Sequence, residues 1–370
     1  NLSIGFKSKE GVFEAVKSIS FNIDKGKTLA LVGESGSGKS VTALSILQLL
    51  PYQTASHSKE SSIRLDGKEL IDMSANQIRA IRGDSVTMIF QEPMTSLNPY
   101  QRVGYQIEEV LIVHQQLSRK VAREKTITLL EKVRIPEAQM KANAYPHQLS
   151  GGQRQRIMIA MALANQPDLL IADEPTTALD VTVEKTLLEL LTELQIQMGM
   201  SILFITHDLN VVQKFADEVC VMKEGVIVER GTVKKVFSQP EHDYTKMLLD
   251  SIPIPKTKPF LKEKPLLVAE DLEVKYLIRK SFINKRNKYL RAVKNVSIEV
   301  YPGSTTGLVG ESGSGKSSLA RALLGLERST GAIEFNGKNL SSLNKKSRRF
   351  MKKDFQIVFQ DPFGSLSPRQ

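Results

Sequence analysis

The octapeptide Gly-Glu-Ser-Gly-Ser-Gly-Lys-Ser occurs twice in this 370-residue chain, at residues 33–40 and 310–317. Both copies match G-x-x-x-x-G-K-[ST], a loop whose backbone N–H groups cradle phosphates. The similarity extends beyond the loop, because residues 15–40 align on 292–317 without a gap. A period of 310 − 33 = 277 residues indicates a duplicated domain rather than a solenoid array. The sequence therefore predicts two nucleotide-binding domains.

The composition between the two copies changes at residues 252–265, which contain four prolines and several lysines without apolar periodicity. This segment is typical of a linker. We expect a first domain over residues 1–251 and the N-terminal part of a second over 266–370. The second copy ends ten residues after Gln360, so we expect it to lack roughly 150 residues by the measure of the first copy.

The overall composition is ordinary for a globular protein, with 41% hydrophobic and 25% charged residues. No run approaches the ~20 apolar residues that span a bilayer, and one cysteine, Cys220, excludes a disulfide within the sequence. We expect a cytoplasmic protein. The net charge of +11 is concentrated late, at 278–288 and 345–353, with few aromatics between the basic residues. Solvated faces are favoured there over an acidic partner or lipid headgroups.

The apolar pattern predicts an α/β core in the first domain. Three short apolar runs are typical of strands buried on both faces of a parallel sheet, namely 28–33, 168–173 and 201–207. Helices are predicted over 41–50 and 183–199, an antiparallel hairpin turning near Glu224-Gly225 over 219–231, and a mainly helical insert over 102–148. The phosphate loop thus lies between a strand and a helix, as its motif requires.

Each loop carries the groups that bind a triphosphate. Glycines let N–H groups turn inward, Lys39 supplies a mobile charge, and the Ser40 hydroxyl can ligate Mg²⁺. The nucleotide contacts predicted in the first loop are Gly33, Ser35, Gly36, Gly38, Lys39, Ser40 and Thr42. Those predicted in the second are Gly310, Ser312, Gly313, Gly315, Lys316, Ser317 and Ser318, with Ser317 as the metal ligand.

Two carboxylates follow an apolar strand in Leu-Leu-Ile-Ala-Asp-Glu-Pro, residues 169–175. Adjacent carboxylates are often only surface charge, but a strand that leads directly into them favours a functional site. We predict that Asp173 holds Mg²⁺ and that Glu174 is the general base for the attacking water.

The segment Leu-Ser-Gly-Gly-Gln at 149–153 predicts an anion site at a helix N-terminus, with Ser150, Gly151, Gly152 and Gln153 as contacts. Together with the loops and the carboxylates, it resembles the ATP-binding-cassette ATPases over the whole chain. The resemblance implies P-loop NTPase cassettes in tandem, each a parallel-sheet core with an antiparallel β subdomain and a helical subdomain. It also implies that this segment of one cassette closes over the nucleotide of the other, within the chain or in a second copy.

The same resemblance implies further roles, with ATP and Mg²⁺ as the cofactors. Gln91 and Gln360 would sense the γ-phosphate, contact the metal and couple to a membrane partner, and Asp180 would be the aspartate at the cassette interface. His207, in Ile-Thr-His-Asp, would touch the γ-phosphate, although a lone histidine at a strand end is usually structural. The adenine would stack on Phe6 in the first cassette and on Tyr276 in the second, with Phe13 and Tyr289 as alternatives.

Three segments resemble bacterial oligopeptide, dipeptide and nickel importers: 89–99, 145–156 and 242–249. Two fused cassettes with a short linker favour the importers of peptides and microcin C over those of glutathione. The sequence departs from this branch in lacking a cysteine cluster after residue 245 and in having His242-Asp243 where His-Pro is usual. The implied partners are two membrane permease subunits and, indirectly, a periplasmic solute-binding protein, at the cytoplasmic face of the inner membrane.

Two other classes of protein remain as alternatives. A tandem-cassette translation or repair factor would bind nucleic acid, but its long charged linker, zinc modules or coiled coils are absent from the sequence. A regulatory cassette that binds ATP without hydrolysis is disfavoured by Glu174 and His207. We expect no nucleic-acid partner. We also expect half of each composite ATP site in this sequence, because counterparts of Glu174 and His207 are missing after Gln360.

Overall fold

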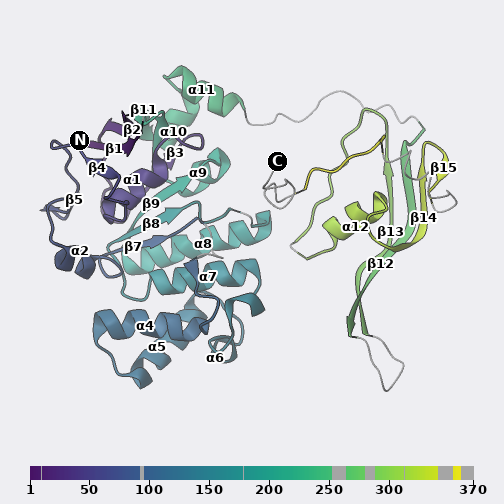
Figure 1. Ribbon diagram of the computed structural model, residues 1–370, viewed down its shortest axis with the longest axis horizontal. Coiled ribbons are helices and arrows are strands. Elements are labelled where there is room, and N and C mark those ends of the chain that lie inside the picture. Colours follow the sequence, from purple (N-terminus) through teal and green to yellow (C-terminus); the bar gives the residue numbers. More distant parts are fainter. Residues whose placement is uncertain are drawn as a thin grey trace. The chain divides into compact units, whose positions relative to one another are not determined.

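The computed structural model describes residues 1–9, 11–91, 96–177, 179–251, 264–279, 288–311, 313–340 and 353–359. The chain divides into two compact units, Asn1–Ile254 and Pro255–Gln370 (Figure 1). Most of the predicted linker, residues 252–263, lies outside the described residues.

A six-stranded sheet forms the centre of the first unit, in the order β11-β10-β3-β9-β8-β7. Its strands are β3 (Thr28–Val32), β7 (Val86–Ile89), β8 (Leu169–Asp173), β9 (Ser201–Thr206), β10 (Glu218–Lys223) and β11 (Val226–Thr232). Neighbours pair in parallel except β10 and β11, which form the predicted hairpin. Positive φ angles of 49° at Glu224 and 84° at Gly225 make its tight turn.

The predicted central strands are confirmed, because every residue of β3, β8 and β9 is buried. Successive residues serve two separate cores. Leu169 and Ile171 pack on one face with β1 and α1, whereas Leu170 and Ala172 pack on the other with α7 and α8. An uninterrupted apolar run is what a strand covered on both faces requires.

Helices surround the sheet of the first unit. They are α1 (Lys39–Ile46), α2 (Ala75–Ile81), α4 (Val103–Gln115), α5 (Arg119–Lys132), α6 (Ala138–Lys141), α7 (Gly151–Ala162), α8 (Val181–Met198), α9 (Leu209–Phe215), α10 (Val233–Ser238) and α11 (Asp243–Asp250). The predicted helical insert is confirmed as α4, α5 and α6, which gather with α7 on one side of the unit in Figure 1. Helix α8 ends at Gly199, whose φ is 65°, as predicted from the sequence.

Two antiparallel sheets complete the first unit. One has the order β2-β1-β4, with β1 (Leu2–Ser8), β2 (Gly11–Ile19) and β4 (Ala55–His57), and the other joins β5 (Arg64–Leu65) to β6 (Lys68–Glu69). Strand β2 reaches the phosphate loop, because a Cβ on Gly38 would lie 2.7 Å from the carbonyl oxygen of Ala15. The three-stranded sheet therefore forms one wall of the loop.

The second unit has a four-stranded antiparallel sheet in the order β13-β12-β14-β15. Its elements are β12 (Leu267–Arg279), β13 (Lys288–Val300), α12 (Lys316–Leu323), β14 (Ser329–Phe335) and β15 (Lys338–Asn339). Residues 304–311, which include the stretch aligned with β3 by the repeat, are irregular, and Val309 is 90% exposed. In the first unit the equivalent β3 pairs with a strand on each side. The described residues of the second unit contain no such neighbours.

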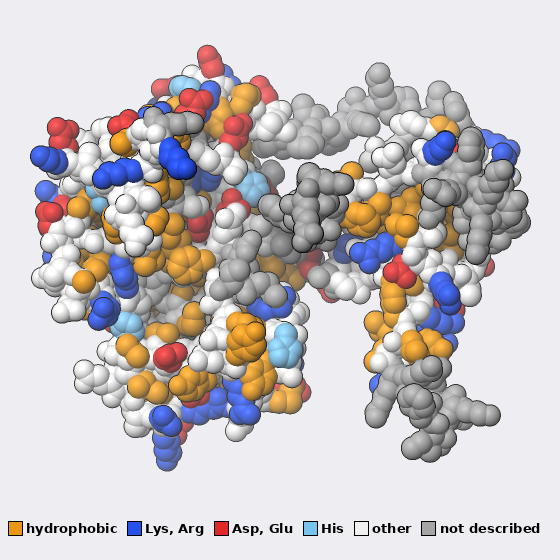
Figure 2. All heavy atoms as spheres, in the orientation of Figure 1, with side chains coloured by type: hydrophobic (Ala, Val, Ile, Leu, Met, Phe, Trp, Pro, Cys, Tyr) orange, Lys and Arg blue, Asp and Glu red, His pale blue; other side chains and the backbone are white. Residues whose placement is uncertain are grey.

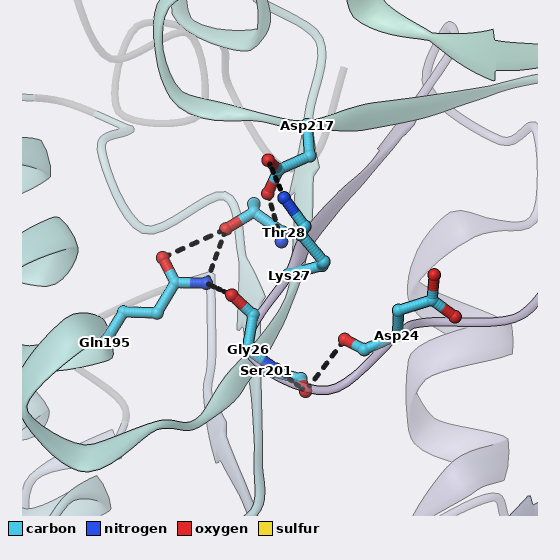
Figure 3. Close-up of polar contacts among 7 residues, drawn as sticks. All are labelled: Asp24, Gly26, Lys27, Thr28, Gln195, Ser201 and Asp217. Atoms are coloured by element: carbon cyan, nitrogen blue, oxygen red, sulfur yellow. Dashed lines mark hydrogen bonds and ion pairs between the residues drawn. The ribbon is translucent and has the colours of Figure 1, made fainter.

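Polar side chains hold the amino end of β3 through hydrogen bonds (Figure 3). The phosphate loop follows the opposite end of this strand. Gln195 of α8 donates to the carbonyl oxygen of Gly26 at 3.2 Å and exchanges hydrogen bonds with the hydroxyl of Thr28. Asp217 accepts from the backbone N–H of Thr28 at 2.9 Å and from the Lys27 ammonium at 3.0 Å. These contacts fix β3 against α8 and the start of β10.

Replacing Gln195 with Leu is expected to lower the stability of the chain. The buried hydroxyl of Thr28 and the carbonyl of Gly26 would lose their amide partner, which costs about 1–3 kcal/mol. We expect the thermal unfolding midpoint, measured by circular dichroism, to fall by several degrees. Gln197→Leu, an exposed position on the same helix, is the matched control and should unfold like the parent chain. Equal midpoints for both variants would contradict this account.

Candidate active site

The first phosphate loop connects β3 to α1 and depends on glycine at three positions. Gly33, Gly36 and Gly38 have φ angles of 151°, 82° and 103°, values that side chains with a Cβ rarely adopt. Gly33 also lies against β10, because a Cβ there would be 2.1 Å from the carbonyl oxygen of Met222. The loop conformation is therefore set by the backbone and its neighbours, ahead of any ligand.

Lys39 begins α1 and folds back over the loop. Its ammonium donates to the carbonyl oxygens of Gly33 at 2.8 Å and Glu34 at 2.7 Å, and its side chain is 6% exposed. Burial lowers the pKa of Lys39, while the nearby Glu174 and Asp173 carboxylates oppose that shift. A buried ammonium held beside two carboxylates is placed to bind a polyphosphate from within the loop.

Asp173 is the last residue of β8 and points toward α1. Burial raises the pKa of Asp173, and a hydrogen bond with Ser40 opposes the shift. Its Oδ1 atom is buried without a hydrogen-bond partner in the described residues, which is the arrangement expected where a metal-bound water belongs. Among the described residues, no cluster of three or more His, Cys, Asp or Glu side chains could hold a metal. Ser40 and Asp173 still fit Mg²⁺, because this ion needs only one or two protein oxygens and usually completes its shell with water and phosphate oxygens.

Glu174 is the residue after Asp173, and its carboxylate contacts three side chains from separate segments. Its carboxylate accepts from Gln91 Nε2 at 2.8 Å and from Thr177 Oγ1 at 3.0 Å, and His207 Nδ1 lies 3.1 Å from its other oxygen. Gln91 follows β7 by two residues and His207 follows β9 by one. Parallel neighbouring strands thus bring together the three residues that the sequence predicts as catalytic.

The environment of Glu174 favours its ionised form. Burial raises the pKa of Glu174, but hydrogen bonds from His207, Thr177 and Gln91 outweigh burial and lower it overall. Glu174 also has a φ of 47°, a left-handed conformation that costs on the order of 1–3 kcal/mol in a residue with a Cβ. The strained backbone turns its side chain toward His207 and Gln91, where an ionised carboxylate can accept a proton from water.

Residues 149–153 form the predicted helix N-terminus. Ser150 is the N-cap of α7, its hydroxyl accepting from the N–H of Gln153 at 3.3 Å, while the Gln153 side chain accepts from the N–H of Ser150 at 3.1 Å. Gly152 has no space for a side chain, because a Cβ would lie 2.8 Å from Val183 at the start of α8. Asp180 is the N-cap of α8 and accepts from the N–H of Val183 at 2.9 Å. The nucleotide contacts of this segment remain predictions.

The remaining predicted residues of the first unit lie around the loop. Thr42 is fully buried and its hydroxyl donates to the carbonyl oxygen of Gly38, so its side chain offers no free hydroxyl to a ligand. Phe6 and Phe13 face each other across β1 and β2. Phe6 packs partly into the core, whereas Phe13 is 65% exposed. The adenine contact stays a prediction.

The second loop repeats the backbone of the first. Gly310, Gly313 and Gly315 have φ angles of 152°, 81° and 100°, and the Lys316 ammonium donates to the carbonyl oxygens of Gly310 and Glu311 at 2.7 Å each. The hydroxyl of Tyr276 donates to Ser318 at 3.2 Å, which joins β12 to α12. Tyr289 is exposed on β13, and Ser317 is exposed at the start of α12. Two predicted contacts, Ser312 and Gln360, lie outside the described residues.

Two residues with contacts at or next to Glu174 are not predicted as site residues from the sequence. Thr177 donates to the carboxylate of Glu174, but threonine in a turn has no signal of its own. Gln155 of α7 is buried and its amide donates to the carbonyl oxygen of Pro175. This contact links the helix after Ser150 to the strand end that carries Glu174.

Comparison with known proteins identifies this constellation. A family model described as "ABC transporter" matches residues 16–177 and 293–370, which together exceed half of the chain. The chain belongs to the ABC transporter family. A second model, "Oligopeptide/dipeptide transporter, C-terminal region", matches residues 228–271. The predicted membership of the ATP-binding-cassette ATPases, in the oligopeptide and dipeptide branch, is therefore confirmed.

Individual relatives are similar along the whole chain. It is 50% identical over 370 residues to the peptidoglycan transport ATP-binding protein YejF of Agrobacterium fabrum, covering all of this chain and 68% of that protein. It is 44% identical over 402 residues to the glutathione import ATP-binding protein GsiA of Escherichia coli, covering all of this chain and 64% of the relative. The chain thus spans about two thirds of the length of both.

A solved structure supports the cassette fold. The dimeric, post-hydrolysis ATP-binding cassette MJ0796, bound to ADP and phosphate, aligns with a TM-score of 0.56 at 29% sequence identity. The alignment covers 63% of this chain and 99% of that cassette. The predicted P-loop NTPase cassette, with a mixed sheet and surrounding helices, is confirmed.

Thr177→Val is expected to change the pH dependence of ATP hydrolysis. The variant removes one donor to Glu174, so the pKa of this carboxyl rises toward its ordinary value and more of it is protonated at a given acidic pH. The acidic limb of the activity profile should therefore move to higher pH. Thr177→Ser keeps the hydroxyl and should retain the parental profile. An unchanged acidic limb in Thr177→Val would refute the role of this hydrogen bond.

Proposed function

We propose that this chain is the ATP-binding and ATP-hydrolysing subunit of a bacterial ABC importer for peptides or peptide-like substrates. The observation that carries the proposal is the convergence of Gln91, Thr177 and His207 on the ionised Glu174. This carboxylate lies close enough to Lys39 of the phosphate loop to affect its pKa. A P-loop beside an oriented carboxylate is suited to phosphoryl transfer to water. A cassette that only bound nucleotide would not need such a base.

In the proposed reaction, the triphosphate lies in the loop 33–40, with its β- and γ-phosphates on the loop N–H groups and the Lys39 ammonium. Mg²⁺ would be held by Ser40 and Asp173 and would neutralise phosphate charge when bound. Glu174 accepts the proton of the attacking water, while Gln91 and His207 orient this carboxylate and reach the γ-phosphate. Each of these roles is part of the proposal.

We further propose that the two units are tandem cassettes, with residues 1–251 as the first and 266–370 as part of the second. The matching φ angles and lysine contacts of the two loops support this assignment. A cassette dimer would form within the chain or with a second copy of it, with Ser150, Gly151, Gly152, Gln153 and Asp180 facing the nucleotide of the other cassette. The second loop would then bind ATP through Lys316 and Ser317.

The names of two relatives support a peptide-like cargo. YejF is named for peptidoglycan transport and GsiA for glutathione import, and both substrates contain peptide bonds. No helix among the described residues is long and apolar enough to cross a membrane. We propose that two separate permease subunits form the channel, that a periplasmic binding protein delivers the substrate, and that the chain acts at the cytoplasmic face of the inner membrane.

Charges of both signs are mixed on one face of the first unit. On the face drawn in Figure 2, Lys and Arg side chains are interspersed with Asp and Glu, whereas nucleic-acid-binding domains typically cluster Lys and Arg in a basic patch or stripe. Purification with two membrane subunits would support the importer, whereas recovery with ribosomes or DNA would contradict it.

Glu174→Gln is expected to retain ATP binding and to lose hydrolysis. The amide keeps the size of the side chain but cannot accept a proton, so turnover should fall by roughly 10²- to 10⁴-fold. Phosphate release and nucleotide binding should be measured on the same preparation. Glu189→Gln, on the exposed side of α8, is the matched control. Hydrolysis by Glu174→Gln at the parental rate would show that Glu174 is not the base.

The cargo is tested by uptake in cells that lack this gene. Loss of uptake of defined oligopeptides, with glutathione uptake intact, is the expected result. Normal peptide uptake in the deletion strain would overturn the assignment to peptide import.

A further inference from the structure

Tyr244 lies beneath the first phosphate loop, although it is 210 residues away in the sequence. It belongs to α11, in the segment that follows the cassette core, and its side chain is 4% exposed. The ring packs with Val32, Val219 and Val221, on the face of the sheet shared by β3 and β10. No role predicted from the sequence includes this side chain.

The hydroxyl of Tyr244 holds the loop itself. It accepts a hydrogen bond from the backbone N–H of Glu34 at 3.1 Å. The carbonyl oxygen of Glu34 accepts from the Lys39 ammonium at 2.7 Å. The residue is thus fixed through its N–H by Tyr244 and through its C=O by the lysine that we assign to the phosphates.

Two further contacts hold the same loop from the β10–β11 hairpin. The N–H of Gly225 donates to the carbonyl oxygen of Ser37 at 3.1 Å, and Gly33 lies against the carbonyl of Met222. These contacts hold the loop near Gly33 and Ser37, whereas Tyr244 holds the peptide of Glu34 between them. Helix α11 therefore supports the loop at a further position, the peptide of Glu34.

Contacts with the β10–β11 hairpin and with His242 hold Tyr244 in place. The carboxylate of Glu229 accepts from the N–H groups of Glu241 and His242 at 2.9 and 3.0 Å, which ties the start of α11 to β11. His242 Nδ1 accepts from the N–H of Tyr244 at 3.1 Å. The ammonium of Lys223 lies 5.0 Å from the centre of the Tyr244 ring, within cation–π range. The ring is thus fixed from both strands of the hairpin.

We propose that Tyr244 is a positioning residue for nucleotide binding, acting through the Glu34 peptide and Lys39. This inference rests on the proposed function of the first unit as an ATP site. Tyr244 acts through the shape of the loop, so it supports binding of the phosphates rather than the chemical step. The C-terminal segment of this branch would then be part of the nucleotide site.

Tyr244→Phe removes the hydroxyl and keeps the ring. We expect the Kd for ATP, measured by calorimetry on the full chain, to rise roughly 3- to 10-fold, as for loss of one hydrogen bond. KM should rise by a similar factor, while kcat changes less than about twofold. Tyr105→Phe, at an exposed tyrosine of α4, is the matched control and should bind ATP like the parent chain.

Hydrogen exchange supplies a readout that does not depend on activity. Peptides that contain Glu34 should exchange faster in Tyr244→Phe than in the parent chain without nucleotide, since their N–H loses its acceptor. If the parent chain binds ATP, and Tyr244→Phe has the same Kd for ATP and the same exchange rates, the role of Tyr244 is wrong while the proposed function stands. A parent chain that binds no nucleotide would instead overturn the proposed function. A general loss of stability, with equal exchange changes across the first unit, would also contradict a positioning role.

Discussion

The parallel pairing of β3 with β9, and of β9 with β8, is the constraint on which the candidate site depends. Parallel strands deliver their carboxyl ends to the same edge of a sheet, and ligands of open α/β sheets bind at that edge. Here those ends carry the phosphate loop, Glu174 and His207, and β7 adds Gln91. The groups come from segments up to 207 − 33 = 174 residues apart, yet the pairing of the strands leaves them little freedom. Burial on both faces of the sheet enforces this pairing.

The two ends of the parallel strands differ in their polar contacts. At the amino end of β3, Gln195 and Asp217 form hydrogen bonds with residues 26–28 and hold the strand in place. At the carboxyl ends of the strands, a buried oxygen of Asp173 has no hydrogen-bond partner among the described residues, and Glu174 is held in a left-handed conformation. An unsatisfied buried oxygen next to a strained residue is typical of a functional site. The contacts of Gln195 and Asp217 hold β3 at its opposite end.

The sequence predicted the parts of the site that motifs and apolar strands define. Glu174 and His207 lie at the ends of predicted strands, so their meeting could be expected. The strand before Gln91, β7, is not among those predicted from the sequence. The contacts of Thr177 and Tyr244 could not be expected, since one depends on the unusual φ of Glu174 and the other on packing across 210 residues. The nucleotide contact of Thr42 stays a prediction, and the sequence does not show that its buried hydroxyl bonds to the carbonyl oxygen of Gly38. The residues before the second loop are irregular although they align with β3, and the described residues of the second unit offer them no neighbouring strands, which a strand needs.

The most direct test of this account is a crystal structure of the chain with Mg²⁺ and a non-hydrolysable ATP analogue. We predict the β- and γ-phosphates within the loop 33–40, the metal against Ser40 and Asp173, and the Glu174 carboxylate facing the γ-phosphate. Nucleotide phosphates bound outside this loop, or a metal away from Ser40 and Asp173, would contradict the account.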